Sequence, residues 1–133
     1  MPFVNVKIAG PTLAPEQFSR LQRGMTDIMV DTLGKDPAIT SVLVEQVAAR
    51  GWSIADAEVH VFAHVSARIT GGINTANEKA RFIADAHTLL KRMLGGGLPV
   101  ATYVIVDEVA ADAWGYDGIT QQQRAAVMQQ PTA

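Results

Sequence analysis

Apolar and polar residues alternate at the start of the chain. Residues 3–8 follow a period of two, which predicts a half-buried strand. Between residues 14 and 33 the apolar positions recur at steps of three and four, the spacing of an amphipathic helix that ends at Gly34. A short β-branched stretch over residues 39–47 predicts a second strand. This order favours a βαβ unit whose two strands are parallel.

The same order of elements follows in the second half. Residues 59–70 predict a strand, and residues 100–109 predict another that is rich in β-branched side chains. Between them, Thr75 and Glu78 have the spacing of a capping box, and the apolar face that follows predicts a helix to residue 94. The second half is therefore expected to be another βαβ unit.

The two halves are related in sequence as well as in pattern. A shift of 61 residues, which becomes 62 after one inserted residue, superimposes apolar positions, both helix-ending glycines, two prolines and both tryptophans. The matched pairs include Val4 with Val65, Ile8 with Ile69, Gly34 with Gly95, Pro37 with Pro99 and Trp52 with Trp114. The chain is thus a tandem duplication of one unit.

The duplication predicts the architecture. We expect one α/β (α+β) domain over 1–133, built from βαβ repeats at about 1–58 and 59–118, with a polar C-terminal tail at 119–133. The four strands form a mixed sheet with both helices on one face. Strands this apolar favour covering of the opposite face by other subunits. The tail is expected to be mobile or to lie on a neighbouring subunit.

Composition narrows the classes of function. The 133 residues are 48% hydrophobic and 18% charged, with a net charge of −2 and no cysteine. No basic stripe favours nucleic acid, and no apolar run approaches the ~18 residues of a membrane span. Thiolate chemistry and disulfides are excluded, and the three histidines lack the spacing of a metal site. We expect a cytoplasmic protein without metal or membrane contact.

Pro2 is the candidate for chemistry. Met1 precedes a small residue, the situation in which the initiator is normally trimmed, and trimming leaves Pro2 with a secondary amine at the start of a strand. An α-amino group titrates near ~8 in water, and an apolar pocket disfavours its charged form. Such an amine is suited to act as a general base near neutral pH.

These features together resemble the tautomerase superfamily, the group typified by 4-oxalocrotonate tautomerase. The residues that carry the resemblance are Met1-Pro2 before the strand at 3–8, Thr26-Asp27, Leu33 to Pro37, and Tyr103 to Val109 leading to Trp114 to Gly118. The resemblance covers residues 1 to about 118 in two copies. Short family members assemble as hexamers and fused ones as trimers, which implies a homotrimer here.

The resemblance implies a role for Pro2 and none for a cofactor. The Pro2 amine would act as general base or acid and move a proton between oxygen and carbon of an enol. The second unit has Ala63 at the matching position, inside the chain and without a free amine. The resemblance therefore implies one catalytic amine per chain.

The substrate-binding residues depart from the family's best-known pattern. The arginine of the second strand is matched by Leu43 and Ile105, and the arginine after the first strand by the turns Gly10-Pro11 and Gly71-Gly72. Neither arginine carries over, which weakens the case for a dicarboxylate substrate or a dehalogenase. The aromatic residue of the closing hairpin is matched by Trp52 and Trp114.

Five residues are candidates for binding the substrate. Trp52 or Trp114 would form an apolar wall, and Arg68 would face a carboxylate. Tyr103 would donate a hydrogen bond to a developing enolate oxygen, as would Tyr116. Each also has a structural alternative, since aromatic residues dominate cores and a strand arginine is usually solvated or paired.

The sequence thus favours a cofactor-independent isomerase of small enols or 2-oxo acids, provided that Met1 is removed. One alternative is a trimeric scaffold of the same fold without activity. Another is a different Pro2-dependent reaction, namely hydration, dehalogenation or decarboxylation of a small unsaturated acid.

Overall fold

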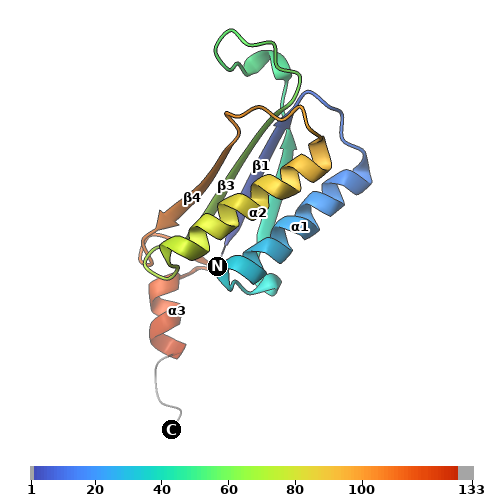
Figure 1. Cartoon of the computed structure of the whole chain (residues 1–133). Coiled ribbons are helices and arrows are strands. Elements are labelled where there is room, and N and C mark those ends of the chain that lie inside the picture. Colours follow the sequence, from blue (N-terminus) through green and yellow to red (C-terminus); the bar gives the residue numbers. More distant parts are fainter. Residues whose placement is uncertain (1, 129–133) are drawn as a thin grey trace.

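The computed structural model describes residues 2–128. Two long helices cover one face of a four-stranded sheet (Figure 1). The strands are β1 (Phe3–Ala9), β2 (Ser41–Gln46), β3 (Phe62–Thr70) and β4 (Tyr103–Val109), in the spatial order β2-β1-β3-β4. β1 pairs with β2 and β3 pairs with β4 in parallel, whereas the central pair β1 and β3 is antiparallel. The predicted fold of two βαβ units in one mixed sheet is confirmed.

The helices begin and end where local chemistry requires. Helix α1 (Pro15–Leu33) begins with a proline, whose missing N–H costs nothing there, and ends at Gly34 in the left-handed region at φ 68°. Helix α2 (Ala76–Leu94) begins with the predicted capping box, in which Thr75 Oγ1 accepts a hydrogen bond from the Glu78 N–H. Within residues 2–128, neither long helix is apolar enough along its length to span a membrane.

The core lies between the sheet and the helices. Alternate residues of the two central strands turn toward the helices and are fully buried, because side chains alternate between the faces of a strand. They meet the buried stripes of α1 and α2. The central members of this core are Val4, Val6, Ile8, Val65, Ala67, Ile69, Leu21, Met25, Met29, Phe82, Ala86 and Leu90.

The face of the sheet that the helices leave uncovered carries both polar and large apolar side chains. Strand register places Leu43, Asn5, Ser66 and Ile105 in one row across it. Leu43 is 44% exposed and Ile105 is 43% exposed, although aliphatic residues of this size are usually buried. Phe3 and Tyr103 are also exposed large hydrophobic residues.

Several boundaries differ from the predicted ones. β3 begins at Phe62 and β4 at Tyr103, each three residues after the predicted start, because extended-looking loop residues precede them. Short 3-10 helices, η1 (Pro37–Ile39) and η2 (Ala49–Gly51), flank β2.

The C-terminal segment contains more structure than its pattern predicted. A small hairpin of β5 (Gly115–Tyr116) and β6 (Ile119–Thr120) follows β4, and a third helix, α3 (Gln121–Met128), follows the hairpin. The resemblance already implied a closing hairpin at 114–118, whereas from residue 119 onward only a polar tail was predicted. The last five residues of that predicted tail, 129–133, lie outside the described residues.

Candidate active site

Pro2 lies immediately before β1 and is fixed by its neighbour strand. Its side chain is buried, and its carbonyl oxygen accepts a hydrogen bond from the Ser41 N–H at 3.2 Å. Because β1 and β2 are parallel, the segment that leads into β2 lies beside the first residues of the chain. This places Ile39 and Ser41 next to Pro2.

A cavity of about 320 Å³ opens at this end of the sheet. It is lined by Pro2, Phe3, Ile39 and Ser41 from the starts of β1 and β2, by Arg68 from β3, and by Trp114, Gly115 and Tyr116 from the hairpin. Most of this lining is apolar. Among residues 2–128, Arg68 is the only lining residue with a formal charge.

Strand direction explains why residues so distant in sequence meet here. β3 runs antiparallel to β1, so its last residues lie beside the first residues of β1, with Arg68 opposite Phe3. β4 is parallel to β3, so the hairpin that follows β4 reaches the same edge. The cavity therefore combines the beginning of the first unit with the end of the second.

Trp114 is held in the cavity wall by a hydrogen bond to the sheet. Its Nε1–H donates to Oγ1 of Thr70, the last residue of β3, at 3.1 Å. Thr70 is only 6% exposed, so this bond satisfies a buried hydroxyl group. The Trp114 carbonyl oxygen accepts a hydrogen bond from the Gln121 N–H at 2.9 Å, which joins the hairpin to α3.

Tyr116 is held from the other side by α3. The Arg124 guanidinium lies over the Tyr116 ring, with Cζ 3.8 Å from the ring centroid, and Arg124 Nη2 donates to the Tyr116 carbonyl oxygen at 2.8 Å. A cation over an aromatic face is a favourable arrangement. The helix absent from the sequence prediction thus positions one wall of the cavity.

Arg68 projects from β3 onto the uncovered face of the sheet, and its side chain is 61% exposed. Its Nε lies 3.5 Å from Oδ2 of Asp107, its partner in the register between β3 and β4. An exposed ion pair of this kind contributes little to stability, about 0–1 kcal/mol. The guanidinium still has donors for an anion in the cavity, because it carries five N–H groups.

The structure brings together four of the six predicted site residues. Pro2, Arg68, Trp114 and Tyr116 line the cavity, whereas Trp52 and Tyr103 do not. Trp52 stacks on Phe62 with ring centroids 5.2 Å apart, at the opposite end of the sheet. Tyr103 pairs with His64 on the uncovered face and is largely exposed.

Sequence reasoning missed Ile39 and Ser41. Neither residue is unusual in type, and both lie in a segment that was assigned only as a strand. The usable signal was the predicted parallel pairing of the first two strands, which places the residues before β2 beside Pro2. Ala63, which matches Pro2 in the second unit, is a buried residue inside β3 opposite Ile8.

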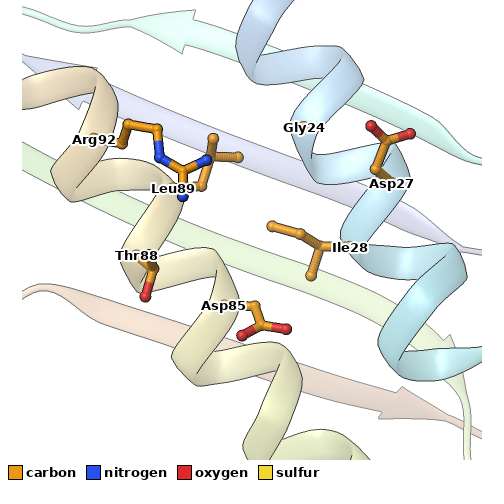
Figure 2. A pocket seen from close by; sticks show the side chains of 7 residues that line it. All are labelled: Gly24, Asp27, Ile28, Asp85, Thr88, Leu89 and Arg92. Carbon is orange, nitrogen blue, oxygen red and sulfur yellow. The ribbon is translucent and has the colours of Figure 1, made fainter.

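A second hollow of about 270 Å³ lies between the helices, on the side away from the sheet (Figure 2). Here α1 approaches α2 at Gly24, where a Cβ atom would come within 2.7 Å of Leu89 Cδ2. Asp27, Asp85 and Arg92 surround the hollow with charge. None of the predicted site residues contributes to it.

A third hollow of about 270 Å³ lies on the uncovered face of the sheet and includes Lys7 and His64. The His64 pKa is lowered from its usual value, first because burial penalises the charged imidazole and second because the Lys7 ammonium repels it. Its Nδ1 is buried and has no hydrogen-bond partner among the described residues. His64 does not line the Pro2 cavity, and its lowered pKa favours the neutral imidazole.

Comparison with known proteins finds relatives for both halves of the chain. The family model described as "Tautomerase enzyme" matches residues 2–61 and again residues 62–124. The probable tautomerase K2 of Dickeya dadantii (strain 3937) is 44% identical over 54 residues, which is 41% of this chain and 81% of that protein.

Solved structures share the fold at low sequence identity. A fused 4-OT wild-type symmetric trimer has a TM-score of 0.78 and 19% identity, covering 92% of this chain and 98% of that one. Pt0534 inactivated by 2-oxo-3-pentynoate has a TM-score of 0.80 and 15% identity, covering 96% and 99%. At these identities the likeness shows the common fold.

Proposed function

The chain belongs to the tautomerase family, and from this premise we propose that it is a cofactor-independent tautomerase of small 2-oxo acids. The observation that carries the proposal is the cavity at the start of β1, in which Pro2, Arg68 and Trp114 meet. The proposed reaction moves one proton between the enol oxygen and a carbon atom. No redox partner or metal takes part in such a step.

The Pro2 amine is the proposed proton carrier once Met1 has been removed. Its neutral form takes the proton from the enol hydroxyl group, the carbonyl bond forms, and the electron pair of the carbon–carbon double bond accepts the proton back at carbon. The apolar lining supports this role, because surroundings of this kind favour a neutral amine over an ammonium ion. The amine is regenerated in each turnover.

Arg68 and Trp114 are proposed to hold the substrate during this transfer. The Arg68 guanidinium would bind the carboxylate next to the reacting carbonyl group, since guanidinium and carboxylate groups match in geometry. Trp114 and Ile39 would exclude water from the carbon end. Trp52 and Tyr103 keep their predicted roles only if another copy of the chain brings them to a cavity, because both lie away from Pro2 in the chain itself.

The uncovered face of the sheet supports a homotrimer. Exposed Phe3, Leu43, Tyr103 and Ile105 all lie on this face, which the helices do not reach. Large apolar side chains that are exposed together on one face are typical of an interaction site. We propose that three copies cover these faces around a common axis, and the fused 4-OT of the same fold is a symmetric trimer.

The central test compares the wild type with Pro2→Ala on an aryl enolpyruvate, followed by loss of enol absorbance. Intact mass first establishes that Met1 is absent from both proteins. We expect Pro2→Ala to lower kcat/KM by roughly 10²- to 10⁴-fold, the usual value of a positioned general base. Pro99→Ala is the matched control, because Pro99 lies outside the cavity. Equal rates for the wild type and Pro2→Ala would favour the scaffold alternative.

The assembly has its own test. Ile105→Glu places a charge on the uncovered face, and Ile83→Glu makes the same change on α2 at a residue of nearly equal exposure, 41% against 43%. Sedimentation analysis should show that only Ile105→Glu dissociates. If the two variants sediment alike, the uncovered face is not the interface.

A further inference from the structure

The charges around the Pro2 cavity are unusually few. Arg68 is the only charged lining residue among those described, and it is already paired with Asp107. The ion pair is fixed by strand register, because Arg68 and Asp107 are direct partners between β3 and β4. The site therefore presents one cation whose charge is partly compensated.

Two other cations lie near the cavity but outside it. Lys7 lies opposite His64 in the register between β1 and β3, and it lines the neighbouring hollow on the uncovered face, which also includes Arg68. Arg124 donates to the Tyr116 carbonyl oxygen and lies over the Tyr116 ring. Neither is placed among the lining residues, so a second anionic group in the cavity would meet no unpaired cation from residues 2–128 of the same chain.

The remaining walls match an apolar group. Phe3, Ile39 and Trp114 present ring and aliphatic surfaces, and the volume of about 320 Å³ is within the usual range for a small-molecule site. A substrate that binds Arg68 through one carboxylate would therefore extend its other end into apolar surroundings. A second carboxylate at that end would lose its hydration without compensation.

We infer that Asp107 is a specificity-determining residue which restricts the site to 2-oxo acids with one carboxylate and an apolar remainder. The inference rests on the proposed function for the identity of the reaction, but the charge preference itself is a property of binding. Asp107 acts in two ways: it orients Arg68 through Nε, and its own charge repels a second carboxylate. Asp107 does not line the cavity, so it is a positioning residue with no direct part in the reaction.

The test measures binding of 2-oxo acids that are already at keto–enol equilibrium, so that no net turnover accompanies the titration. Isothermal titration compares phenylpyruvate, which carries one carboxylate, with 2-oxoadipate, which carries two, on the full chain. We expect the wild type to bind phenylpyruvate at least tenfold more tightly. Asp107→Asn should improve binding of the monoanion about threefold and of the dianion about tenfold. The gain is larger for the dianion because the Asp107 carboxylate repels both of its carboxylates. High salt should reduce both gains.

Matched variants separate the effect of Asp107 on ligand preference from changes in net charge and from loss of folding. Asp85→Asn alters the net charge equally but lies on α2 at the hollow between the helices, so its binding ratio should equal that of the wild type. Asp107→Glu keeps the charge and should keep the preference. Arg68→Gln should weaken both ligands together. Circular dichroism identifies any variant that does not fold, and Asp107→Ser then replaces Asp107→Asn.

The inference is overturned if the wild type binds the dianion as tightly as the monoanion, or if Asp107→Asn leaves the binding ratio unchanged. Failure of the proposed function is a distinct result. In that case the binding ratios hold while Pro2→Ala turns over the aryl enolpyruvate as fast as the wild type. The two proposals therefore fail on different measurements.

Discussion

Replacing Trp114 by phenylalanine should weaken both the fold and the active-site wall. The substitution keeps an aromatic ring but removes the Nε1–H that donates to Thr70 Oγ1 at 3.1 Å. A net hydrogen bond contributes about 1 kcal/mol, and leaving a buried partner unsatisfied costs about 1–3 kcal/mol. Thr70 is 6% exposed, so we expect the free energy of unfolding to fall by about 1–3 kcal/mol.

A double-mutant cycle isolates this hydrogen bond. Thr70→Val removes the acceptor with little change in shape and leaves the Trp114 N–H without its partner. Because the double variant loses both polar groups, it should be less destabilised than the sum of the single variants by about 1 kcal/mol. Urea unfolding followed by circular dichroism, at one protein concentration for all four proteins, measures this coupling.

The same cycle reports on the cavity. Gly115 and Tyr116 follow Trp114 directly and line the cavity, so a shift of the hairpin moves the wall opposite Pro2. A displacement of about 1 Å lowers activity roughly 10²-fold. Additive stability changes, or normal kcat/KM in Trp114→Phe, would refute the argument that this bond positions the wall.

Three other substitutions test the elements that place the site. Gly10→Ala should destabilise by at least ~2 kcal/mol in urea unfolding, because Gly10 has φ 105° and a Cβ atom there would collide with the His60 carbonyl oxygen. Thr75→Ala should cost about 1 kcal/mol in the same assay, through loss of the α2 cap. His64 has a pKa below its usual 6.5 in the folded chain, through burial and then Lys7, so the unfolded chain binds more protons between the two values. Stability should therefore fall as pH decreases from about 7 toward 5, and His64→Gln should flatten that slope in thermal denaturation across pH.

Much of the fold was predictable because the relevant signals are local. Alternation in residues 3–8, the capping box at Thr75 and the glycine at the end of α1 each act over a few residues, and all three occur where expected. The duplication then constrained the topology, because two copies of one unit must share one sheet. The third helix was not predicted, since α3 carries a weak apolar stripe and depends on tertiary contacts such as Arg124 with Tyr116.

The candidate site was predictable only in part, for a geometric reason. Pro2 and Arg68 were selected by residue type, but Ser41 and Ile39 are ordinary residues that strand register brings beside Pro2. Because Trp52 and Trp114 occupy matching positions in the repeat, the sequence predicted a place in the cavity wall equally for both. The two tryptophans differ in position because β1 and β3 are antiparallel. This pairing places the ends of the two units at opposite ends of the sheet.

Because β1 and β3 are antiparallel, the two units contribute differently to the proposed site. At one edge, Trp114 closes a cavity around Pro2, which precedes its strand and carries a free amine once Met1 is removed. At the other edge, Trp52 stacks on Phe62, and the residue that matches Pro2 is Ala63, whose nitrogen is a peptide nitrogen within β3. A peptide nitrogen is not basic near neutral pH, so no substitution at Ala63 alone would turn its backbone nitrogen into a second proton carrier. Placing a base at that end of the sheet would require opening the chain before Ala63, so that its nitrogen becomes a free amine.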